Sequence, residues 1–138
     1  MKYIIYGINR TAKDFMYIFN ELDILYLTDD DVEPGRIVWE KYSVRRLEDA
    51  LKDTSYDRII ICDFDKAEKE GRLRAEGLAY GKDYVYAEDF FDSLDAFSIP
   101  QDRKIAVWGT GNMCRFLMGK NLPWKADVFI DSYKKTDF

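Results

Sequence analysis

The chain has 138 residues, 47% of them apolar and 16% aromatic, so it can bury one core and part of a second. Its net charge of −5 argues against a nucleic-acid partner, and the absence of histidine removes Ser-His and Cys-His nucleophile pairs. No apolar run exceeds strand length and no signal-peptide pattern opens the chain, so we predict a cytoplasmic protein without a membrane span.

Strand and helix patterns alternate through the first part of the chain. Residues 3–6 predict a buried strand, and residues 11–22 a helix presenting Phe15, Ile18, Phe19 and Leu22 at helical spacing. Acids and a Pro-Gly pair predict a loop at residues 28–35. The other predicted elements are strands at residues 24–27, 37–39 (an edge strand), 58–62 and 84–86, and helices at 47–51, 65–78 (polar, with its own charge pairs) and 88–94. This alternation predicts an α/β protein: a Rossmann-like three-layer fold with a mainly parallel sheet.

A polar segment containing Pro100 divides the chain. We predict a Rossmann-like domain over residues 1–97, a linker at 98–103 and an incomplete second β-α-β unit over residues 104–138. Strands at 105–108 and 128–130 flank a helix at 112–120 in that second unit. A unit of this size cannot bury both faces of its sheet. It is therefore expected to extend the first sheet, to pair with another chain, or to belong to a longer protein.

The second unit repeats the start of the first. A shift of 102 positions places Gly7 on Gly109, Met16 on Met118 and Asp29 on Asp131. Both copies have an apolar strand, a turn of small residues, a short helix and a second strand that ends at an acid. This order of elements is typical of nucleotide-binding α/β folds.

The second copy has the better phosphate-binding turn. Residues 109–114 read GTGNMC, in which two glycines permit a sharp turn and close approach to a phosphate, and Cys114 is small enough for the helix to pack closely. Asp131 follows Gly109 by 22 residues, where an acid binds ribose hydroxyls. Asn112 has a second interpretation, as a cap of the helix. The candidate ligand-binding residues of this copy are Gly109, Thr110, Gly111, Asn112 and Asp131.

The first copy has a modified turn. Residues 7–12 read GINRTA, and Asn9 stands where the fingerprint has its second glycine. Asparagine tolerates a positive φ, so we expect the turn to form, with a side chain that crowds a pyrophosphate. A single phosphate or carboxylate would then meet Arg10 or Thr11, and a sugar hydroxyl would meet an acid after the second strand. The candidate residues of this copy are Gly7, Asn9, Arg10, Thr11, Asp29 and Asp30.

Each candidate also has a structural interpretation. Small residues at a strand-to-helix turn can serve packing alone, and Asp29, Asp30 and Asp131 can be solvated strand ends. The two cysteines lack CxxC spacing, so neither a metal site nor a disulfide is predicted, and Cys62 fits a buried strand. No catalytic residue is predicted.

Several segments resemble modules of known enzymes. Residues 3–7, the acids Asp29 and Asp30, and residues 56–61 resemble the Rossmann-like modules at the front of bacterial sugar acyltransferases and nucleotide-sugar dehydratases. Residues 104–111 and 129–131 resemble the opening of the same module. The resemblance implies that the module holds a nucleotide or nucleotide-sugar, with the glycine turn near the phosphates and the acid near a hydroxyl.

We therefore expect a nucleotide or nucleotide-sugar binding domain of a larger protein in glycan or polysaccharide biosynthesis, not catalytic alone. One alternative is a fragment of an NAD(P)-dependent oxidoreductase or of an S-adenosylmethionine-dependent methyltransferase. The other is a ligand-free module that forms a homodimer through a sheet edge or through an aromatic surface at Phe90, Phe91 and Phe97.

Overall fold

The computed structural model describes residues 1–93, 103–108 and 126–130. The chain divides into two compact units, Met1–Asp89 and Phe90–Phe138. Of the predicted linker only Arg103 is described, and the predicted helix at 112–120 lies outside the described residues.

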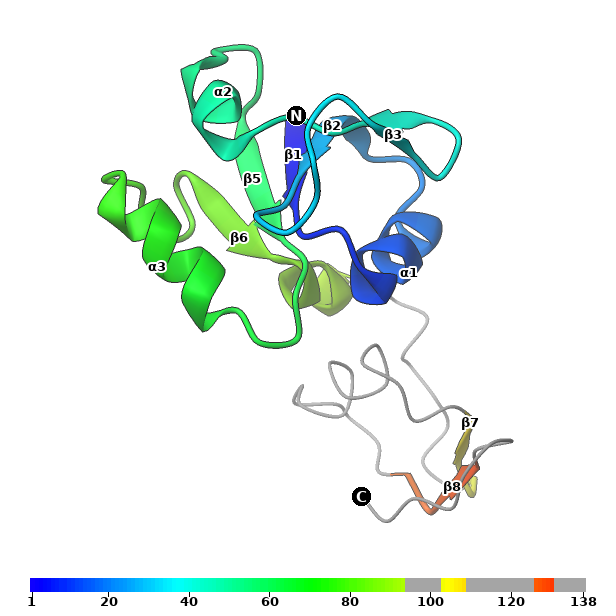
Figure 1. The fold of residues 1–138 in the computed structure, drawn as a ribbon. Coiled ribbons are helices and arrows are strands. Elements are labelled where there is room, and N and C mark those ends of the chain that lie inside the picture. The colour runs from blue at the N-terminus through cyan, green and yellow to red at the C-terminus, as the bar shows by residue number, and fades with distance from the viewer. Residues whose placement is uncertain (94–102, 109–125, 131–138) are drawn as a thin grey trace. The chain divides into compact units, whose positions relative to one another are not determined.

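The first unit is an α/β unit built on a four-stranded parallel sheet (Figure 1). Its strands are β1 (Lys2–Tyr6), β2 (Asp23–Thr28), β5 (Arg58–Ile61) and β6 (Tyr84–Tyr86), in the order β2-β1-β5-β6. Tyr6 at the end of β1 lies opposite Thr28 of β2 and Ile61 of β5. The chain moves from β1 to β2 and then returns past β1 to β5, so the direction of strand order reverses between β1 and β5.

The two central strands are buried on both faces. Ile4 and Ile5 of β1, and Ile59 to Ile61 of β5, have no exposed surface. Successive side chains of a strand point to opposite faces, so the sheet must be covered on both sides. The continuous apolar runs that predicted these strands follow from this double burial.

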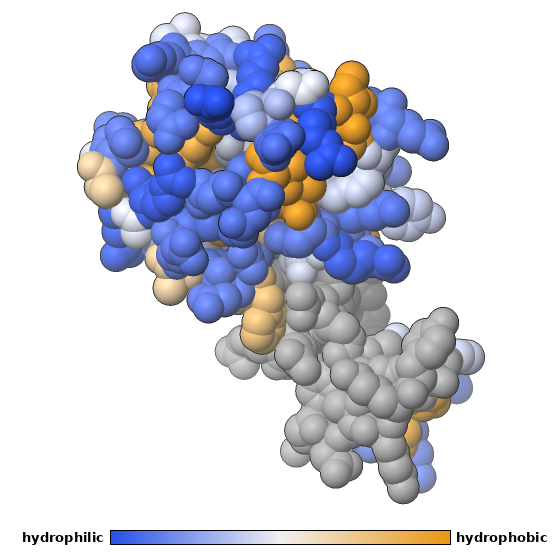
Figure 2. Space-filling model, viewed as in Figure 1, coloured by the Kyte–Doolittle hydropathy of each residue, from blue (hydrophilic) through white to orange (hydrophobic). Residues whose placement is uncertain are grey.

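Helices pack on both faces of the parallel sheet. The helices α2 (Leu47–Lys52) and α3 (Ala67–Ala75) pack on one face, and α1 (Arg10–Ile18) lies on the other side of the sheet (Figure 1). The core beneath α2 and α3 consists of Ile4, Tyr6, Tyr26, Leu47, Ala50, Ile59, Ile61, Leu73 and Tyr84. The surface of the first unit is largely hydrophilic on the face drawn in Figure 2.

Helix α1 differs from its prediction in length and in orientation. It ends at Ile18 rather than at residue 22, because Phe19 leaves the helical region with φ −103° and ψ 54°. Phe15 and Phe19 are buried as predicted, whereas Ile18 is 43% exposed, and Thr11, Ala12 and Met16 are buried as well. The buried stripe is therefore rotated from the predicted one, since two small residues of the first turn face the sheet.

The predicted edge strand at 37–39 is part of a separate hairpin. Strand β3 (Ile37–Val38) pairs antiparallel with β4 (Tyr42–Ser43), which the sequence did not predict. Residues 39–41 form the connection, in which Trp39 and Glu40 have φ values of 50° and 63°. Their sequence has neither the glycine nor the asparagine that signals such a turn.

Two predicted helices are also altered. Helix α3 covers residues 67–75 of the predicted 65–78, and the segment Ala87–Ser93 (η1) is a 3-10 helix rather than an α-helix. Gly77, with φ 83°, follows the end of α3, as glycine commonly does after a helix.

The described strands of the second unit reproduce the pairing of the first. Strand β7 (Ala106–Trp108) pairs in parallel with β8 (Val128–Ile130). Trp108 lies opposite Ile130, and Tyr6 lies opposite Thr28. These pairs differ by the same 102 positions as the sequence repeat, so the repeat extends to strand register.

Candidate functional site

The predicted residues of the first copy lie at the carboxyl ends of the parallel strands. Gly7 follows β1, while Asp29 and Asp30 follow β2. Asp63 follows β5 and Glu88 follows β6, so acids stand after three of the four strands. In open α/β sheets this edge, where strand order reverses, is the usual position of a ligand.

Gly7 is fixed by close backbone packing. Its φ is +129°, and a Cβ atom there would lie 2.2 Å from the carbonyl oxygen of Cys62. Its amide donates to the Thr28 carbonyl at 2.9 Å. The glycine is thus required by the approach of the β1 turn to the end of β5, whether or not a ligand binds.

Asn9 joins the turn to helix α1 and to β5. Its side-chain oxygen accepts from the Ala12 amide at 2.9 Å and so caps the helix. Its side-chain nitrogen donates to the Cys62 carbonyl at 2.9 Å. The backbone at Asn9 is extended, with φ −155°, so the expected use of a positive φ is wrong.

Asp29 closes the glycine turn from the side of β2. One carboxylate oxygen accepts from the Ile8 amide at 2.6 Å, and the other accepts from the Asp31 amide at 3.1 Å. The Ile8 amide is one of the donors that a phosphate would otherwise meet in such a turn. The acid expected to bind a hydroxyl therefore also holds the turn.

Asp30 is bonded to helix α3, which packs on the face of the sheet opposite α1. Its carboxylate accepts from the Tyr6 hydroxyl at 2.7 Å and forms an ion pair with Arg72 of α3. Arg72 also pairs with Glu48 at 3.2 Å. Burial, the largest influence, raises the pKa of Tyr6 to about 12, so its phenol remains a donor at neutral pH.

Two lysines of the α3 segment complete the edge. Lys69 pairs with Asp63 at 2.8 Å, and Lys66 pairs with Glu88 at 2.7 Å. Burial alone would lower the pKa of Lys69, but its hydrogen bond to Asp63 and the charges of Asp29, Asp63 and Asp31 raise it. Sequence reasoning missed these residues. The available signals were the acids that follow β5 and β6 and the basic residues spaced three apart, Lys66, Lys69 and Arg72.

Arg10 and Thr11 are adjacent in the first turn of α1, but only Thr11 is buried. Thr11 is 2% exposed and belongs to the buried stripe, so its side chain is not presented to the edge. Arg10 is exposed and pairs with Asp14 at 3.1 Å. Cys62 is fully buried, and burial raises the pKa of its thiol, which agrees with a packing role.

Two buried oxygens at this edge lack partners within the described part of the chain. They are the Thr28 hydroxyl and Oε2 of Glu88. Buried polar atoms are nearly always hydrogen-bonded, so exceptions suggest an ordered water or a ligand.

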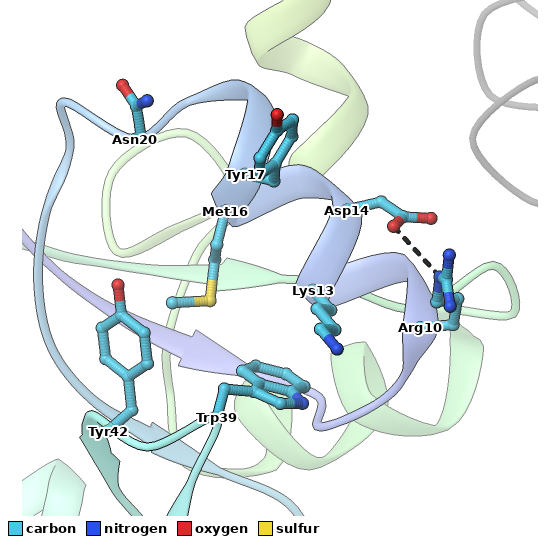
Figure 3. A pocket seen from close by; sticks show the side chains of 8 residues that line it. All are labelled: Arg10, Lys13, Asp14, Met16, Tyr17, Asn20, Trp39 and Tyr42. Atoms are coloured by element: carbon cyan, nitrogen blue, oxygen red, sulfur yellow. Dashed lines mark hydrogen bonds and ion pairs between the residues drawn. The ribbon is translucent and has the colours of Figure 1, made fainter.

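A pocket of about 360 Å³ lies between α1 and the hairpin (Figure 3). Helix α1 and the segment after it supply one wall, and the hairpin supplies the other. Met16 points from the helix toward the hairpin, from which Tyr42 and Trp39 project (Figure 3). The lining residues are Arg10, Lys13, Asp14, Met16, Tyr17, Asn20, Trp39 and Tyr42, so Arg10 is the one predicted site residue among them.

The candidate residues of the second copy, Gly109, Thr110, Gly111, Asn112 and Asp131, lie outside the described residues. Across the described ranges, no three His, Cys, Asp or Glu side chains group as a metal site, and no helix is long and apolar enough to cross a membrane. The chain matches no protein-family model, no curated protein and no solved structure.

Proposed function

We propose that the first unit is a Rossmann-like domain that binds a nucleotide or nucleotide-sugar, and that it serves a larger protein rather than acting as a free-standing catalyst. The observation that supports this most is the reversal of strand order between β1 and β5. The acids after β2 and β5 and the cap of α1 converge at the carboxyl ends of these strands. The sequence resemblance extends the proposal to a role in glycan or polysaccharide biosynthesis.

The sugar is the part of the ligand that suits this edge. Each carboxylate oxygen has two lone pairs, and those of Asp29 and Asp30 each accept one described bond, so a second lone pair can accept from a sugar hydroxyl. A phosphate is less suited to the turn, because Asp29 takes the Ile8 amide and places a negative charge beside it. This difference disfavours any ligand whose phosphate must bond to the Ile8 amide, so the diphosphate of a nucleotide-sugar has to lie away from that amide.

Calorimetric titration of the full chain tests the proposal. UDP-glucose is expected to bind, and Asp30→Asn and Asp63→Asn to weaken its binding about tenfold or more, because each loses a charged acceptor. Glu21→Gln, an exposed acid beyond the end of α1, is the control and should bind as the wild type. Binding of NAD or S-adenosylmethionine instead of UDP-glucose would favour the oxidoreductase or methyltransferase alternative. Unchanged binding in both variants would exclude this edge.

A ligand-free interaction module is the second candidate. The internally bonded turn favours it, because Asp29 and Asn9 satisfy turn and helix donors without a ligand. If none of the three compounds raises the melting temperature of the full chain, this candidate is the better one. Measuring the mass of the chain in solution then shows whether it forms the expected homodimer.

A further inference from the structure

The pocket between α1 and the hairpin combines aromatic rings with cations. Trp39 and Tyr42 come from the hairpin, and Arg10 and Lys13 come from the helix. Asp14 is the one acid in the lining, so the pocket is locally cationic on a chain whose net charge is −5. This combination suits a ligand that carries both a ring and an anionic group.

Lys13 and Trp39 are the lining residues with the most capacity for a ligand. Neither side chain has an ion pair, hydrogen bond or ring contact with another residue in the described ranges, whereas Arg10 is paired with Asp14 at 3.1 Å. Lys41 already lies over the Tyr42 ring, at 5.3 Å from its centroid. Lys13 and Trp39 line the same pocket from its two walls (Figure 3), so one ligand can meet both.

The backbone that presents Trp39 is strained. Trp39 and the next residue, Glu40, both have positive φ, 50° and 63°, and for residues other than glycine this costs about 1–2 kcal/mol each. Such strain persists where the surrounding structure or a function maintains it. Here it places a tryptophan, which gains nothing from a tight turn, at the wall of a pocket.

The size of the pocket fits one ring with one phosphate. Its volume of about 360 Å³ lies at the lower end for small-molecule sites. The helical part of the lining extends from Arg10 to Tyr17, which is about 10 Å at helical rise, and Asn20 lies beyond the end of the helix. The Asn20 amide and the Asp14 carboxylate add groups that can bond to ring hydroxyls or to base edges.

We propose that this pocket binds a small monophosphate whose ring stacks on Trp39 and whose phosphate pairs with Lys13. A nucleoside monophosphate and a sugar monophosphate share this chemistry. The site is separate from the acids at the carboxyl ends of the strands, so it stands or falls independently of the proposed nucleotide-sugar site.

Calorimetric titration of the full chain with uridine monophosphate and with glucose-1-phosphate tests the proposal and distinguishes the two sources. At least one should bind, and uridine, glucose and inorganic phosphate should each bind about tenfold or more weakly, because each lacks the ring or the phosphate. Trp39→Ala and Lys13→Ala should each weaken the binding about tenfold or more. Trp39→Phe keeps a ring and should restore most of the affinity.

Two controls separate this site from other effects. Lys52→Ala removes an exposed lysine of α2, outside the lining, and should bind as the wild type. Asp30→Asn alters the carboxyl edge and should leave monophosphate binding intact. The proposal is overturned if neither monophosphate binds, or if Trp39→Ala and Lys13→Ala, shown by circular dichroism to be folded, bind as the wild type. It is also overturned if Asp30→Asn abolishes binding while both pocket variants retain it.

Discussion

Backbone geometry at Gly7 leaves no room for a side chain. A Cβ atom would meet the Cys62 carbonyl oxygen at 2.2 Å, and the φ of +129° is itself unfavourable for any other residue. Gly7→Ala must therefore push β1 and β5 apart, and we expect it to lower the free energy of unfolding by at least about 3 kcal/mol. Urea unfolding followed by circular dichroism measures this loss.

Two other glycines separate the contributions to that loss. Gly35 has φ +85° but open space around a Cβ, so Gly35→Ala should cost only the backbone strain, about 1–2 kcal/mol. Gly71 lies inside α3 with open space and no positive φ, so Gly71→Ala should stabilise by about 0.5–1 kcal/mol. A Gly7→Ala variant no less stable than Gly35→Ala would show that the contact with Cys62 is not limiting.

Tyr6 gives the fold a dependence on alkaline pH. Burial raises its pKa from 10.0 to about 12, and burial likewise raises the pKa of Tyr26 to about 12. A raised tyrosine pKa means that folding favours the neutral phenol, so this stabilisation is complete below pH 10 and is lost as the pH rises toward 12. The free energy of unfolding, measured in urea across that window, should fall.

Tyrosine variants test whether buried phenols cause this loss of stability at alkaline pH. Tyr6→Phe cannot ionise, so its stability should decline less steeply above pH 10 than that of the wild type. Tyr17→Phe removes a hydroxyl from a ring that is 83% exposed and should leave the slope unchanged. Equal slopes in the wild type and in Tyr6→Phe would assign the alkaline loss to other groups.

At the residue scale, the sequence indicated which side chains lie together at the strand ends but not the groups to which they bond. The pattern singled out Gly7, Asn9, Asp29 and Asp30, and the structure brings all four to one end of the sheet. It did not show that Asn9 bonds to a carbonyl 53 positions away or that Asp30 meets Arg72 from 42 positions away. Such contacts depend on strand order, which no local pattern records.

At the scale of elements, burial explains which predictions held. The strands of the parallel sheet were predicted because double burial leaves continuous apolar runs. The hairpin was missed because Trp39 and Glu40 adopt a turn that their side chains disfavour. In the polar segment 65–78 the predicted pairing within the helix is confirmed for Arg74 and Glu70, at 3.5 Å. Lys66, Lys69 and Arg72 instead pair with acids that follow strands.

Helix α3 is consequently attached to the sheet by charge as well as by Leu73, its one buried residue. The Lys69 and Asp63 side chains are only 12% and 30% exposed, so their pairing is less screened than a surface pair. A double-mutant cycle with Lys69→Met and Asp63→Asn should give a coupling energy of about 1 kcal/mol or more. Urea unfolding of the four proteins supplies the values.

The pair Arg10–Asp14 is the matched control for this cycle. Its side chains are 82% and 38% exposed, and it joins two residues of one helix. Its coupling energy should stay below about 0.5 kcal/mol. If the two couplings are equal, partial burial adds nothing to the Lys69–Asp63 pair, and α3 is held by Leu73 and by its other contacts.

At the scale of the whole molecule, the repeat was the most informative feature of the sequence. It predicted two copies of one parallel strand pair, and the described strands keep the same register in both. The strand order β2-β1-β5-β6 was not predicted, because a parallel sheet leaves open the side of β1 on which each new strand is added. The site depends on that order, so only its individual residues could be foreseen.

The closed core of the first unit predicts that this unit folds alone. The four strands of its parallel sheet, the helices α1, α2 and α3 and the core cluster all lie within Met1–Asp89. A fragment of residues 1–93 should therefore unfold cooperatively, at a melting temperature close to that of the corresponding transition in the full chain. A fragment of residues 1–79 is the contrast: it lacks β6 and with it Tyr84, a fully buried member of the core, and leaves one side of β5 unpaired. We expect no cooperative transition from the shorter fragment, because it loses a buried aromatic side chain worth about 3–5 kcal/mol and the pairing of a strand.

Calorimetry of the two fragments and the full chain tests this prediction. A 1–93 fragment without a cooperative transition would mean that the core depends on the rest of the chain, and the binding experiments would then have no meaning on the first unit alone.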